Sequence, residues 1–300
     1  MIFEKLAQRI RRDLRKIPLL QNSFYFLYKL FFKPSHVRRL KKGFCPLCGK
    51  NSFMLIDSKF VRETGICLIC SANTRYRFMA EILKRLIIIK YFNNKLDKER
   101  LYDLVKKIEL WQYPLRKVLK VIKSKNIWIY EPSALGAMHN VLKKHPKFVY
   151  SEYWPYPNLI SGKMYGGIQF EDLQSLSFED DKFDLVITQD ILEHVRDLSL
   201  TLKEIYRILK PYGIHVFTVP IGKNEKTIHR IDKNDNVLIE PINYHTDHLA
   251  PEGSKVYRDF GTDITEILKN HKFESFILIQ NKDFKKGIYS KVHIIISVKK

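Results

Sequence analysis

The stretch of residues 183–220, FDLVITQDILEHVRDLSLTLKEIYRILKPYGIHVFTVP, limits the possible folds of this chain more than any other. Residues 183–188 form a short apolar run with β-branched side chains, which predicts a buried strand. Apolar residues then recur every three or four positions over residues 198–209, which predicts an amphipathic helix. The run Lys-Pro-Tyr-Gly predicts the end of that helix, and residues 214–219 predict a second strand. Strand, helix and strand in this order form a βαβ unit, so we expect an α/β fold with a parallel sheet.

Polar side chains follow the first of these strands: Gln189, Asp190, Glu193 and His194. Ligands of open α/β sheets bind beyond the carboxyl ends of the strands, so we expect these side chains to line a site. The stretches FDLVITQDILEHVRD and L..I...LKP.G...FTVP resemble the fourth and fifth motifs of class I S-adenosylmethionine-dependent methyltransferases. The resemblance implies a Rossmann-like methyltransferase sheet with helices on both faces, and S-adenosylmethionine as cofactor. Another doubly wound α/β domain is the alternative, because a fold does not fix its chemistry.

The same resemblance makes His194 and Asp190 the candidate catalytic residues. Gln189 and Asp190 would flank the sulfonium and its methyl group. His194 would be the general base, since imidazole titrates near neutral pH. The alternative for His194 is structural, because the Glu-His pair of methyltransferases also lines or caps the pocket. Methyl transfer requires little beyond an aligned nucleophile and a good leaving group, so positioning can supply much of the rate.

The cysteines of the chain form two CxxC pairs separated by 18 residues: Cys45, Cys48, Cys67 and Cys70. This spacing is typical of a structural zinc site, in which four thiolates close a tetrahedron around the ion. Residues 53–56 and 59–61 predict short strands, so we expect a zinc ribbon over residues 43–72. A redox function is disfavoured because neither pair has the βαβ setting of a thioredoxin-like site. No cysteine is left for a disulfide framework, which suits a reducing compartment.

A helix is predicted to begin at Ser71, with an apolar face formed by Phe78, Ile82, Leu86 and Ile89. The cysteine knuckle and this helix resemble those of a bacterial subgroup of methyltransferase-domain proteins, whose N-terminal zinc ribbon ends in a CG-x-x-x-R-x-R-like helix. Arg75 and Arg77 in its first turn would bind a phosphate or a carboxylate. Alternatively, they pair with acidic residues of the next domain. Residues 73–125 predict a helical connector with these apolar anchors: Leu110, Trp111, Tyr113 and Leu115.

Residues 126–130 predict the first strand of the methyltransferase domain, which would span residues 126–300. In the family, this strand ends in an acidic residue that orients the cofactor, and a glycine-rich turn follows. Here Glu131 takes the acidic position, but Ser133 and Leu135 stand near the usual glycines, and only Gly136 remains. The Ser133 hydroxyl and the amides of the following helix would still offer hydrogen bonds to the cofactor.

The next strand is predicted over residues 148–151, and Glu152 follows it. An acidic residue in this position commonly binds ribose hydroxyls, so Glu152 is the ribose candidate. The pair Asp172-Leu173 resembles the family motif that contacts the adenine amino group of the cofactor. A carboxylate can accept a hydrogen bond from that amino group. Glu171 is the alternative if the register differs by one residue. The predicted cofactor-binding set is Glu131, Ser133, Gly136, Glu152, Asp172, Leu173, Gln189 and Asp190.

Residues 221–260 form a polar insertion, which we interpret as a lid that binds the methyl acceptor. It holds four candidate ligands: His229, His245, Asp247 and His248. The run His-x-Asp-His could bind a metal, but no second ligand pair has a clear spacing, so structural or substrate-contacting histidines are favoured. Residues 273–280 and 290–298 predict an antiparallel pair of closing strands, a feature of the methyltransferase fold.

The chain carries a formal charge of +21, with 53 basic and 32 acidic side chains. This favours anionic partners such as nucleic acid or membrane surfaces, unless it reflects a lysine-rich proteome. Residues 1–42 predict basic amphipathic helices, which would lie on an anionic membrane or pack on the chain's own globular part. No secretory signal or transmembrane helix is predicted. We therefore expect a cytoplasmic protein, with peripheral contact at the inner face of the membrane through this arm as an alternative.

Three functions fit these features. The first is methyl transfer to a glycan or small molecule, since the resembling subgroup is associated with surface polysaccharide genes. The second is RNA methylation, because a zinc ribbon before a methyltransferase domain also resembles ribosomal RNA guanine methyltransferases, and the charge suits a phosphate backbone. One observation argues against RNA methylation: Gln189-Asp190 stands where an enzyme that methylates base amino groups would carry an Asn-Pro-Pro-Tyr-like motif. The third is a catalytically inactive scaffold that kept the fold, lost the cofactor and binds a partner.

Overall fold

The computed structural model describes residues 38–57, 63–93, 95–122, 126–245, 252–284 and 286–300. Most of the predicted N-terminal arm and the predicted strand at residues 59–61 lie outside these ranges. The prediction that the helical arm extends to residue 42 is wrong, because residues 38–42 begin strand β1 (Arg38–Cys45). This strand pairs along its whole length with β2 (Lys50–Asp57), and such pairing outweighs the helical preference of its basic residues.

The three N-terminal strands form a separate small sheet. Strand β2, which contains the strand predicted at residues 53–56, lies between β1 and the short strand β3 (Ile66–Cys67), and both pairings are antiparallel. The turn between β1 and β2 and the turn after β3 each carry one CxxC pair. The sheet therefore brings the two pairs together.

Helix α3 (Thr74–Phe92) begins three residues later than predicted. The backbone of Ser71 has a positive φ of 63°, and the side chain of Asn73 caps the helix by accepting the N–H of Tyr76. The four residues of the predicted apolar face are all buried. Helices α4 (Lys98–Lys107) and α5 (Leu115–Val121) follow.

The prediction of Tyr113 as an apolar anchor is wrong, because the residue is 59% exposed. Its backbone carbonyl is the group that holds this segment, since it accepts a hydrogen bond of 2.7 Å from the buried Lys84. Leu115, another predicted anchor, is fully buried.

The central sheet has six strands in the order β14-β15-β9-β8-β4-β5. Neighbours among the last four strands of this order are parallel, and β15 is antiparallel to both β9 and β14. This confirms the predicted Rossmann-like sheet and its closing antiparallel pair. The strands span Ile129–Glu131 (β4), Phe148–Tyr150 (β5), Phe183–Gln189 (β8), Leu209–Thr218 (β9), Phe273–Gln280 (β14) and Val292–Lys299 (β15).

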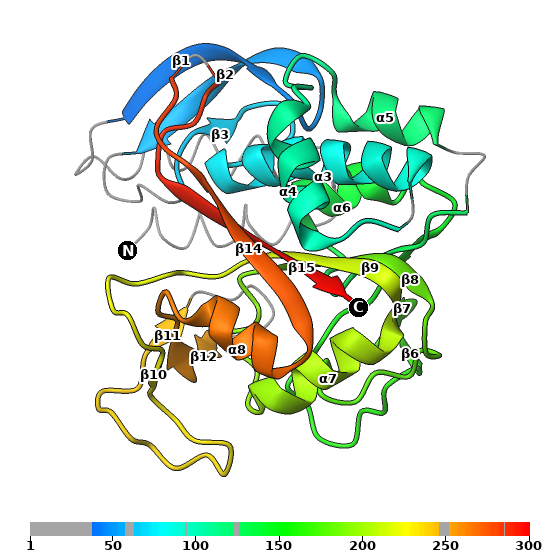
Figure 1. The fold of residues 1–300 in the computed structure, drawn as a ribbon. Helices are drawn as coiled ribbons and strands as arrows, with labels where there is room; N and C mark the ends of the chain where they lie inside the picture. The colour runs from blue at the N-terminus through cyan, green and yellow to red at the C-terminus, as the bar shows by residue number, and fades with distance from the viewer. Residues whose placement is uncertain (1–37, 58–62, 94, 123–125, 246–251, 285) are drawn as a thin grey trace.

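Helices cover both faces of this sheet (Figure 1). Strand β8 shows why, because its buried side chains alternate between two cores. Leu185 and Ile187 pack in the core formed with α3–α5 and with α6 (Gly136–Leu142). Val186 points to the opposite core, where α7 (Leu198–Ile208) and α8 (Ile264–Asn270) pack.

Strand β9 begins earlier than the sequence predicts. Phe183 pairs with Leu209 and Leu185 pairs with Ile214, so residues 210–213 stand opposite Asp184 alone. Tyr212 in this bulge has a positive φ of 62°. The Lys-Pro-Tyr-Gly run therefore ends helix α7 as predicted, but it does so inside a bulged strand rather than in a loop.

The insertion after β9 contains two short antiparallel pairs. Strand β10 (Ile228–His229) pairs with β13 (Arg258–Asp259), and β11 (Tyr244–His245) pairs with β12 (Ser254–Lys255). A further small pair joins β6 (Met164–Tyr165) to β7 (Ile168–Gln169).

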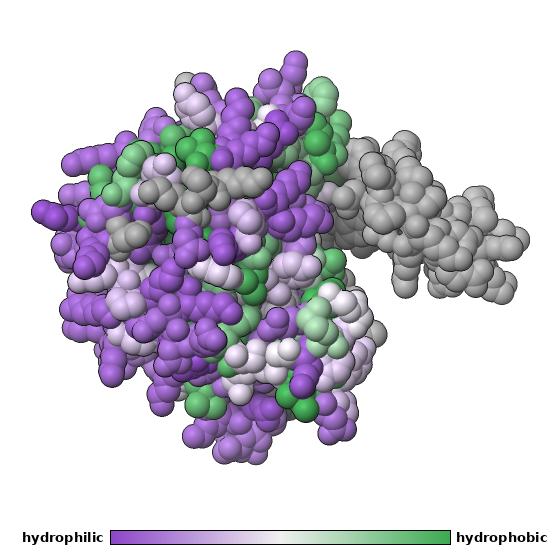
Figure 2. Space-filling view, turned by 90° about the vertical axis from the view of Figure 1, so that its right-hand side faces the viewer, coloured by the Kyte–Doolittle hydropathy of each residue, from purple (hydrophilic) through white to green (hydrophobic). Residues whose placement is uncertain are grey.

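Hydrophilic side chains cover most of the described surface in the view of Figure 2. None of the described helices combines the length and the apolarity needed to cross a bilayer.

Candidate functional site

Glu131 and Gln189 end the neighbouring strands β4 and β8, and their side chains meet. Gln189 Nε2 donates a hydrogen bond of 3.1 Å to Glu131 Oε1. Burial raises the pKa of Glu131 to about 8, against a smaller opposing effect of the Gln189 hydrogen bond. The other two oxygens, Glu131 Oε2 and Gln189 Oε1, are buried without a hydrogen-bond partner among the described residues. With Glu131 ionised, the pair thus offers two buried acceptors for which the described part of the chain supplies no donor.

The loop after β4 brings several predicted cofactor residues together. Gly136 begins α6 with a positive φ of 93°. Glu152, just after β5, accepts the backbone N–H of Ala134 at 3.1 Å and so anchors this loop. The Ser133 hydroxyl donates to the carbonyl of Leu135 at 3.2 Å, which turns it toward its own loop.

The first turn of α3 reaches the same end of the sheet. Arg75 Nε lies 3.1 Å from Asp190 Oδ2 and 3.4 Å from a carboxylate oxygen of Glu63. Asp190 is held in a left-handed conformation with φ 54°, and Thr218 donates to its Oδ1 at 3.0 Å. Burial alone would lower the pKa of Arg75, but these carboxylates outweigh it and raise that pKa. Pairing with the next domain, one of the two alternatives for Arg75, is therefore what the structure shows.

The two arginines of this turn differ in their partners. Arg77 is fully buried and donates to the carbonyls of Gly65, Ala72 and Gly287, so it ties the cysteine-rich segment to the chain before β15. Arg75 is also buried, and each arginine keeps one nitrogen without a partner among the described residues, Nη1 in Arg75 and Nε in Arg77; the difference is that Arg75 pairs with the carboxylates of Glu63 and Asp190. Arg75 is thus suited to hold an anionic group, whereas Arg77 is structural.

Tyr76 belongs to this site although the sequence did not point to it. A Cβ atom at Gly136 would lie 3.4 Å from the Tyr76 hydroxyl, so the ring stands against the turn where glycines are usual. Burial raises the pKa of Tyr76, and the neighbouring Arg75 opposes this effect. The sequence feature that could have pointed to Tyr76 is its position between Arg75 and Arg77.

A cavity of about 450 Å³ opens beyond the strand ends. Its walls include Tyr153, Asp172, Leu173, Ile191, His194 and Tyr257. Glu171 is buried and accepts hydrogen bonds from Gln169 at 2.6 Å and from the backbone of Ser177 at 2.9 Å. Asp172 is only partly buried and accepts from Gln174. Of the two carboxylates considered for the adenine, these contacts favour Asp172.

His194 lies at the junction of the cavity and the insertion. Its Nδ1 is 2.7 Å from the carbonyl oxygen of Lys255, and because a carbonyl only accepts, Nδ1 carries the proton. Its Nε2 lies 3.2 Å from Nδ1 of His245. Glu193 Oε1 is 3.9 Å from a ring nitrogen of each histidine. The sequence did not predict this grouping, and Asp247 and His248 lie outside the described residues.

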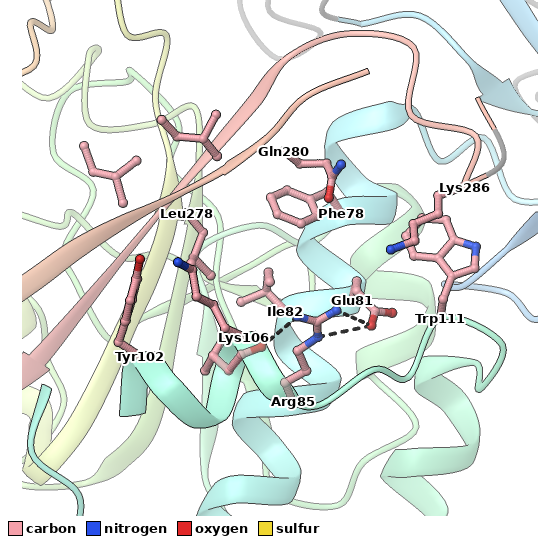
Figure 3. A pocket seen from close by; sticks show the side chains of 13 residues that line it. Phe78, Glu81, Ile82, Arg85, Tyr102, Lys106, Trp111, Leu278, Gln280 and Lys286 are labelled. Carbon is pink, nitrogen blue, oxygen red and sulfur yellow. Dashed lines mark hydrogen bonds and ion pairs between the residues drawn. The ribbon is translucent and has the colours of Figure 1, made fainter. Parts of the chain in front are cut away.

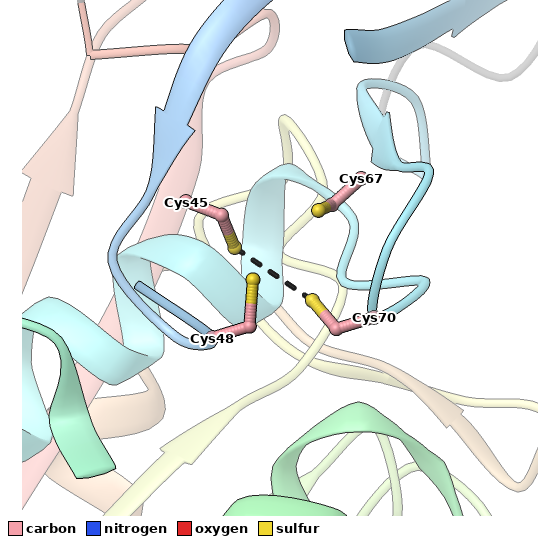
Figure 4. A group of neighbouring side chains, drawn as sticks. All are labelled: Cys45, Cys48, Cys67 and Cys70. Atoms are coloured by element: carbon pink, nitrogen blue, oxygen red, sulfur yellow. Dashed lines mark hydrogen bonds between the residues drawn. The ribbon is translucent and has the colours of Figure 1, made fainter. Parts of the chain in front are cut away.

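The predicted metal ligands of the N-terminal sheet come together as a four-cysteine cluster (Figure 4). All four sulfur atoms lie within 4.8 Å of one another, and Cys45 Sγ is 3.7 Å from Cys70 Sγ. The two knuckles have the same backbone contact: Gly49 N donates to Cys45 O, and Ser71 N donates to Cys67 O, both at 2.8 Å. Four converging thiols in this geometry fit a tetrahedral metal ion.

A second cavity, of about 360 Å³, lies between α3, α4 and β14 (Figure 3). Arg85 and Glu81 point toward one another in it, with Nη2 and Oε1 2.9 Å apart. None of the predicted site residues lines it.

Residues 158–217 match the family model of the methyltransferase domain. This segment holds five predicted site residues: Asp172, Leu173, Gln189, Asp190 and His194. The match supports the resemblance to methyltransferases that the sequence motifs predicted, over the same βαβ unit. No curated protein matches the chain in sequence.

Several solved structures are similar to the chain. A SAM-dependent methyltransferase from Methanosarcina mazei is 17% identical, with 57% of this chain and 91% of that chain covered and a TM-score of 0.37. An S-adenosylmethionine-dependent methyltransferase from Mesorhizobium loti is 14% identical, with coverages of 61% and 96% and a TM-score of 0.39. A Burkholderia thailandensis 1,6-didemethyltoxoflavin-N1-methyltransferase is 14% identical, with coverages of 75% and 90% and a TM-score of 0.35.

Proposed function

We propose that this protein is an S-adenosylmethionine-dependent methyltransferase. One observation carries the proposal: Glu131 Oε2 and Gln189 Oε1 are buried at the carboxyl ends of two adjacent parallel strands and meet no hydrogen-bond partner in the described ranges. Ligands of such sheets bind in this place. The match of residues 158–217 to the methyltransferase domain family names the chemistry that fits there.

The residues of this edge would each hold one part of the cofactor. Glu131 and Gln189 would accept hydrogen bonds from the amino group of its methionine part, and Arg75 would bind the carboxylate. Glu152 would contact the ribose, and Asp172 the adenine amino group, with Leu173 packed against the base. Gly136 leaves room for the cofactor beside the turn. When bound, S-adenosylmethionine supplies an electrophilic methyl group on its sulfonium.

The predicted catalytic residues take different parts in this proposal. Asp190 is a positioning residue, because its carboxylate is engaged by Arg75 and Thr218. His194 lines the cavity on the acceptor side, and its Nε2 is the nitrogen able to take a proton, since Nδ1 donates to Lys255. Tyr244 and Tyr257 line the same side, which suits a small molecule or a sugar that packs on aromatic rings.

The four-cysteine cluster would hold a structural zinc ion. Four thiolates leave no open coordination position, so the ion would stabilise the small sheet rather than take part in chemistry. The zinc ion would also affect cofactor binding indirectly, through the position of Arg75. Arg75 lies five residues after Cys70, so a folded knuckle sets the position of the arginine that would bind the cofactor carboxylate.

Calorimetric titration of the zinc-loaded protein with S-adenosylmethionine and S-adenosylhomocysteine tests the proposal. We expect micromolar binding that Asp172→Ala and Glu152→Ala each weaken. Glu179→Ala, which removes an exposed carboxylate away from the cavity, is the matched control and should bind as the wild type does. If a folded, zinc-containing protein gives no heat with either ligand, the methyltransferase proposal is rejected and the catalytically inactive scaffold is favoured.

The formal charge of +21 supports RNA as a second candidate acceptor. An RNA methyltransferase would bind RNA with an affinity that falls steeply as salt rises, because bound phosphates release counterions. A glycan or small-molecule enzyme would show no such dependence for its acceptor. Filter binding of RNA over a series of salt concentrations separates the two.

A further inference from the structure

Three potential metal ligands converge where the insertion meets the end of β8. One ligand atom from each of Glu193, His194 and His245 lies within 4.8 Å of the others. Glu193 and His194 follow β8, whereas His245 comes from β11, 51 residues further along the chain. Two imidazoles and one carboxylate form a common ligand set for divalent transition metals.

The hairpin of β11 and β12 holds both histidines of this group in position. It carries His245 on β11, and the backbone carbonyl of Lys255 on β12 accepts a hydrogen bond from Nδ1 of His194. With that proton fixed, the lone pair of His194 lies on Nε2, which faces His245 and Glu193. Metal-binding histidines almost always donate their second ring N–H to a carbonyl or carboxylate in this manner.

Exposure changes across the group in one direction. The side chain of Glu193 is 1% exposed, that of His194 18% and that of His245 40%. The carboxylate is therefore the floor, and the side formed by the histidines is open, with His194 in the cavity wall. A three-ligand site with one open side is typical of metal centres that bind a substrate, in contrast to closed structural sites.

We propose that Glu193, His194 and His245 bind a divalent transition-metal ion, of the class of Zn²⁺, Mn²⁺ or Fe²⁺. The two imidazoles suit Zn²⁺ and Fe²⁺ better than Mg²⁺ or Ca²⁺, and the carboxylate also suits Mn²⁺. In this arrangement the Nε2 lone pair of His194 binds the ion and is not the general base. Resting on the proposed methyl transfer, the open side would take a hydroxyl oxygen of the acceptor. The O–H proton would leave to solvent, the oxygen would bond to the methyl carbon, and the S–CH3 bond would break to give S-adenosylhomocysteine.

Electron paramagnetic resonance of Mn²⁺ tests the metal site, because the signal of the free aqueous ion falls on binding. The full chain is used with zinc in its cysteines. Mn²⁺ is the probe since soft thiolates do not select it. We expect one bound Mn²⁺ per chain, and a loss of affinity of more than about tenfold in both His245→Ala and Glu193→Gln. His229→Ala, an exposed histidine of the same insertion outside the group, should bind as the wild type does.

Two results would overturn the site: no loss of free Mn²⁺ signal at millimolar protein, or equal binding by wild type and His245→Ala. Either would leave the group as a hydrogen-bonded histidine pair beside a carboxylate. If buried Glu193→Gln fails to fold by circular dichroism, the half-exposed His245 decides the matter alone. Titration with S-adenosylhomocysteine is run on the same samples. Mn²⁺ binding without cofactor binding keeps the metal site and rejects the methyltransferase, and the converse rejects only the metal site.

Discussion

The four-cysteine cluster and the Glu193–His194–His245 group are built in opposite ways. Each cysteine pair sits on its own tight turn, and only a small three-stranded sheet is needed to join the two. The other group needs β8, the insertion and the hairpin of β11 and β12 to be in place before its ligands meet. The first arrangement lets a metal drive folding, whereas the second requires folding before a metal can bind.

The first turn of α3 connects the cysteine cluster to the end of β8, three residues before Glu193. That helix starts just after the second cysteine knuckle, and its Arg75 contacts Asp190 at the end of β8. Substitutions in the cysteine cluster should therefore also weaken cofactor binding at the carboxyl ends of β4 and β8. Substitutions in the Glu193–His194–His245 group should affect only the metal site.

Loss of a cysteine should have the largest effect. In Cys67→Ser we expect loss of zinc, unfolding of the small sheet and loss of cofactor binding, because structural zinc binds with an apparent ~10 kcal/mol or more. Zinc content, thermal unfolding and S-adenosylhomocysteine titration measure these three results. Ile69→Ser, at an exposed position between Cys67 and Cys70, should retain all of them. Unchanged melting of Cys67→Ser without zinc would contradict a structural role for the metal.

His245→Ala should behave in the opposite way. Without added metal, its free energy of unfolding should change by only about 1 kcal/mol, the value of one hydrogen bond. Mn²⁺ at a hundred times its dissociation constant should stabilise the wild type by about 2.7 kcal/mol, and the variant, after a tenfold or larger loss of affinity, by at most about 1.4 kcal/mol. Thermal unfolding with and without Mn²⁺ gives both numbers. An equal shift in the two proteins would place the ion elsewhere.

Arg75→Lys tests the contact between the helix that follows the cysteine cluster and the end of β8. Lysine keeps a positive charge beside Asp190 but lacks the guanidinium fork, so about 1.5–3 kcal/mol of binding to the cofactor carboxylate should be lost. Affinity for S-adenosylhomocysteine should fall accordingly, while affinity for methylthioadenosine, which has no carboxylate, should be unchanged. Arg100→Lys on the exposed side of α4 is the control. Equal losses for both ligands would show that Arg75 acts only by holding the fold.

Glu131 should make cofactor binding depend on pH. Burial raises its pKa to about 8 in the cofactor-free protein, and the cofactor's ammonium favours the ionised form. Affinity should therefore rise with pH, by up to about tenfold per unit below pH 8, and level off above it. Calorimetry in buffers of different ionisation enthalpy should detect the released proton. Glu131→Gln should remove both effects, and a pH-independent affinity in the wild type would contradict the assignment.

The same shift predicts how stability changes with pH. The pKa of Glu131 is raised from 4.5 to about 8 on folding, so the folded state keeps a proton that the unfolded state loses in this window. Stability without cofactor should fall as pH rises from about 4.5 to 8 and then stay level. Glu131→Gln should flatten this part of the curve, as measured by urea unfolding at several pH values.

Much of the fold could be predicted because it depends on patterns within short stretches. The apolar run before Gln189 and the helical period after Asp197 define a strand and a helix wherever they are placed. The spacing of the cysteines likewise describes a local turn, and Glu131, Glu152 and Asp172 follow from motifs beside their strands. Each of these features needs only a few neighbouring residues to form.

The remaining features were decided by contacts between distant segments. Residues 38–42 became a strand because β2 offered a complete pairing partner, and β9 began early because its bulge passes Asp184. Asp190, one of the two carboxylate partners of Arg75, is 115 positions away in the sequence, and His245 meets Glu193 and His194 only across the insertion. By itself, the sequence determined the elements, the cysteine spacing and the acidic residues at the strand ends. Only the tertiary structure decided which side chains face one another. Sequence periodicity reports on residues within one helix or strand, and it carries no information about contacts between segments that are far apart in the chain.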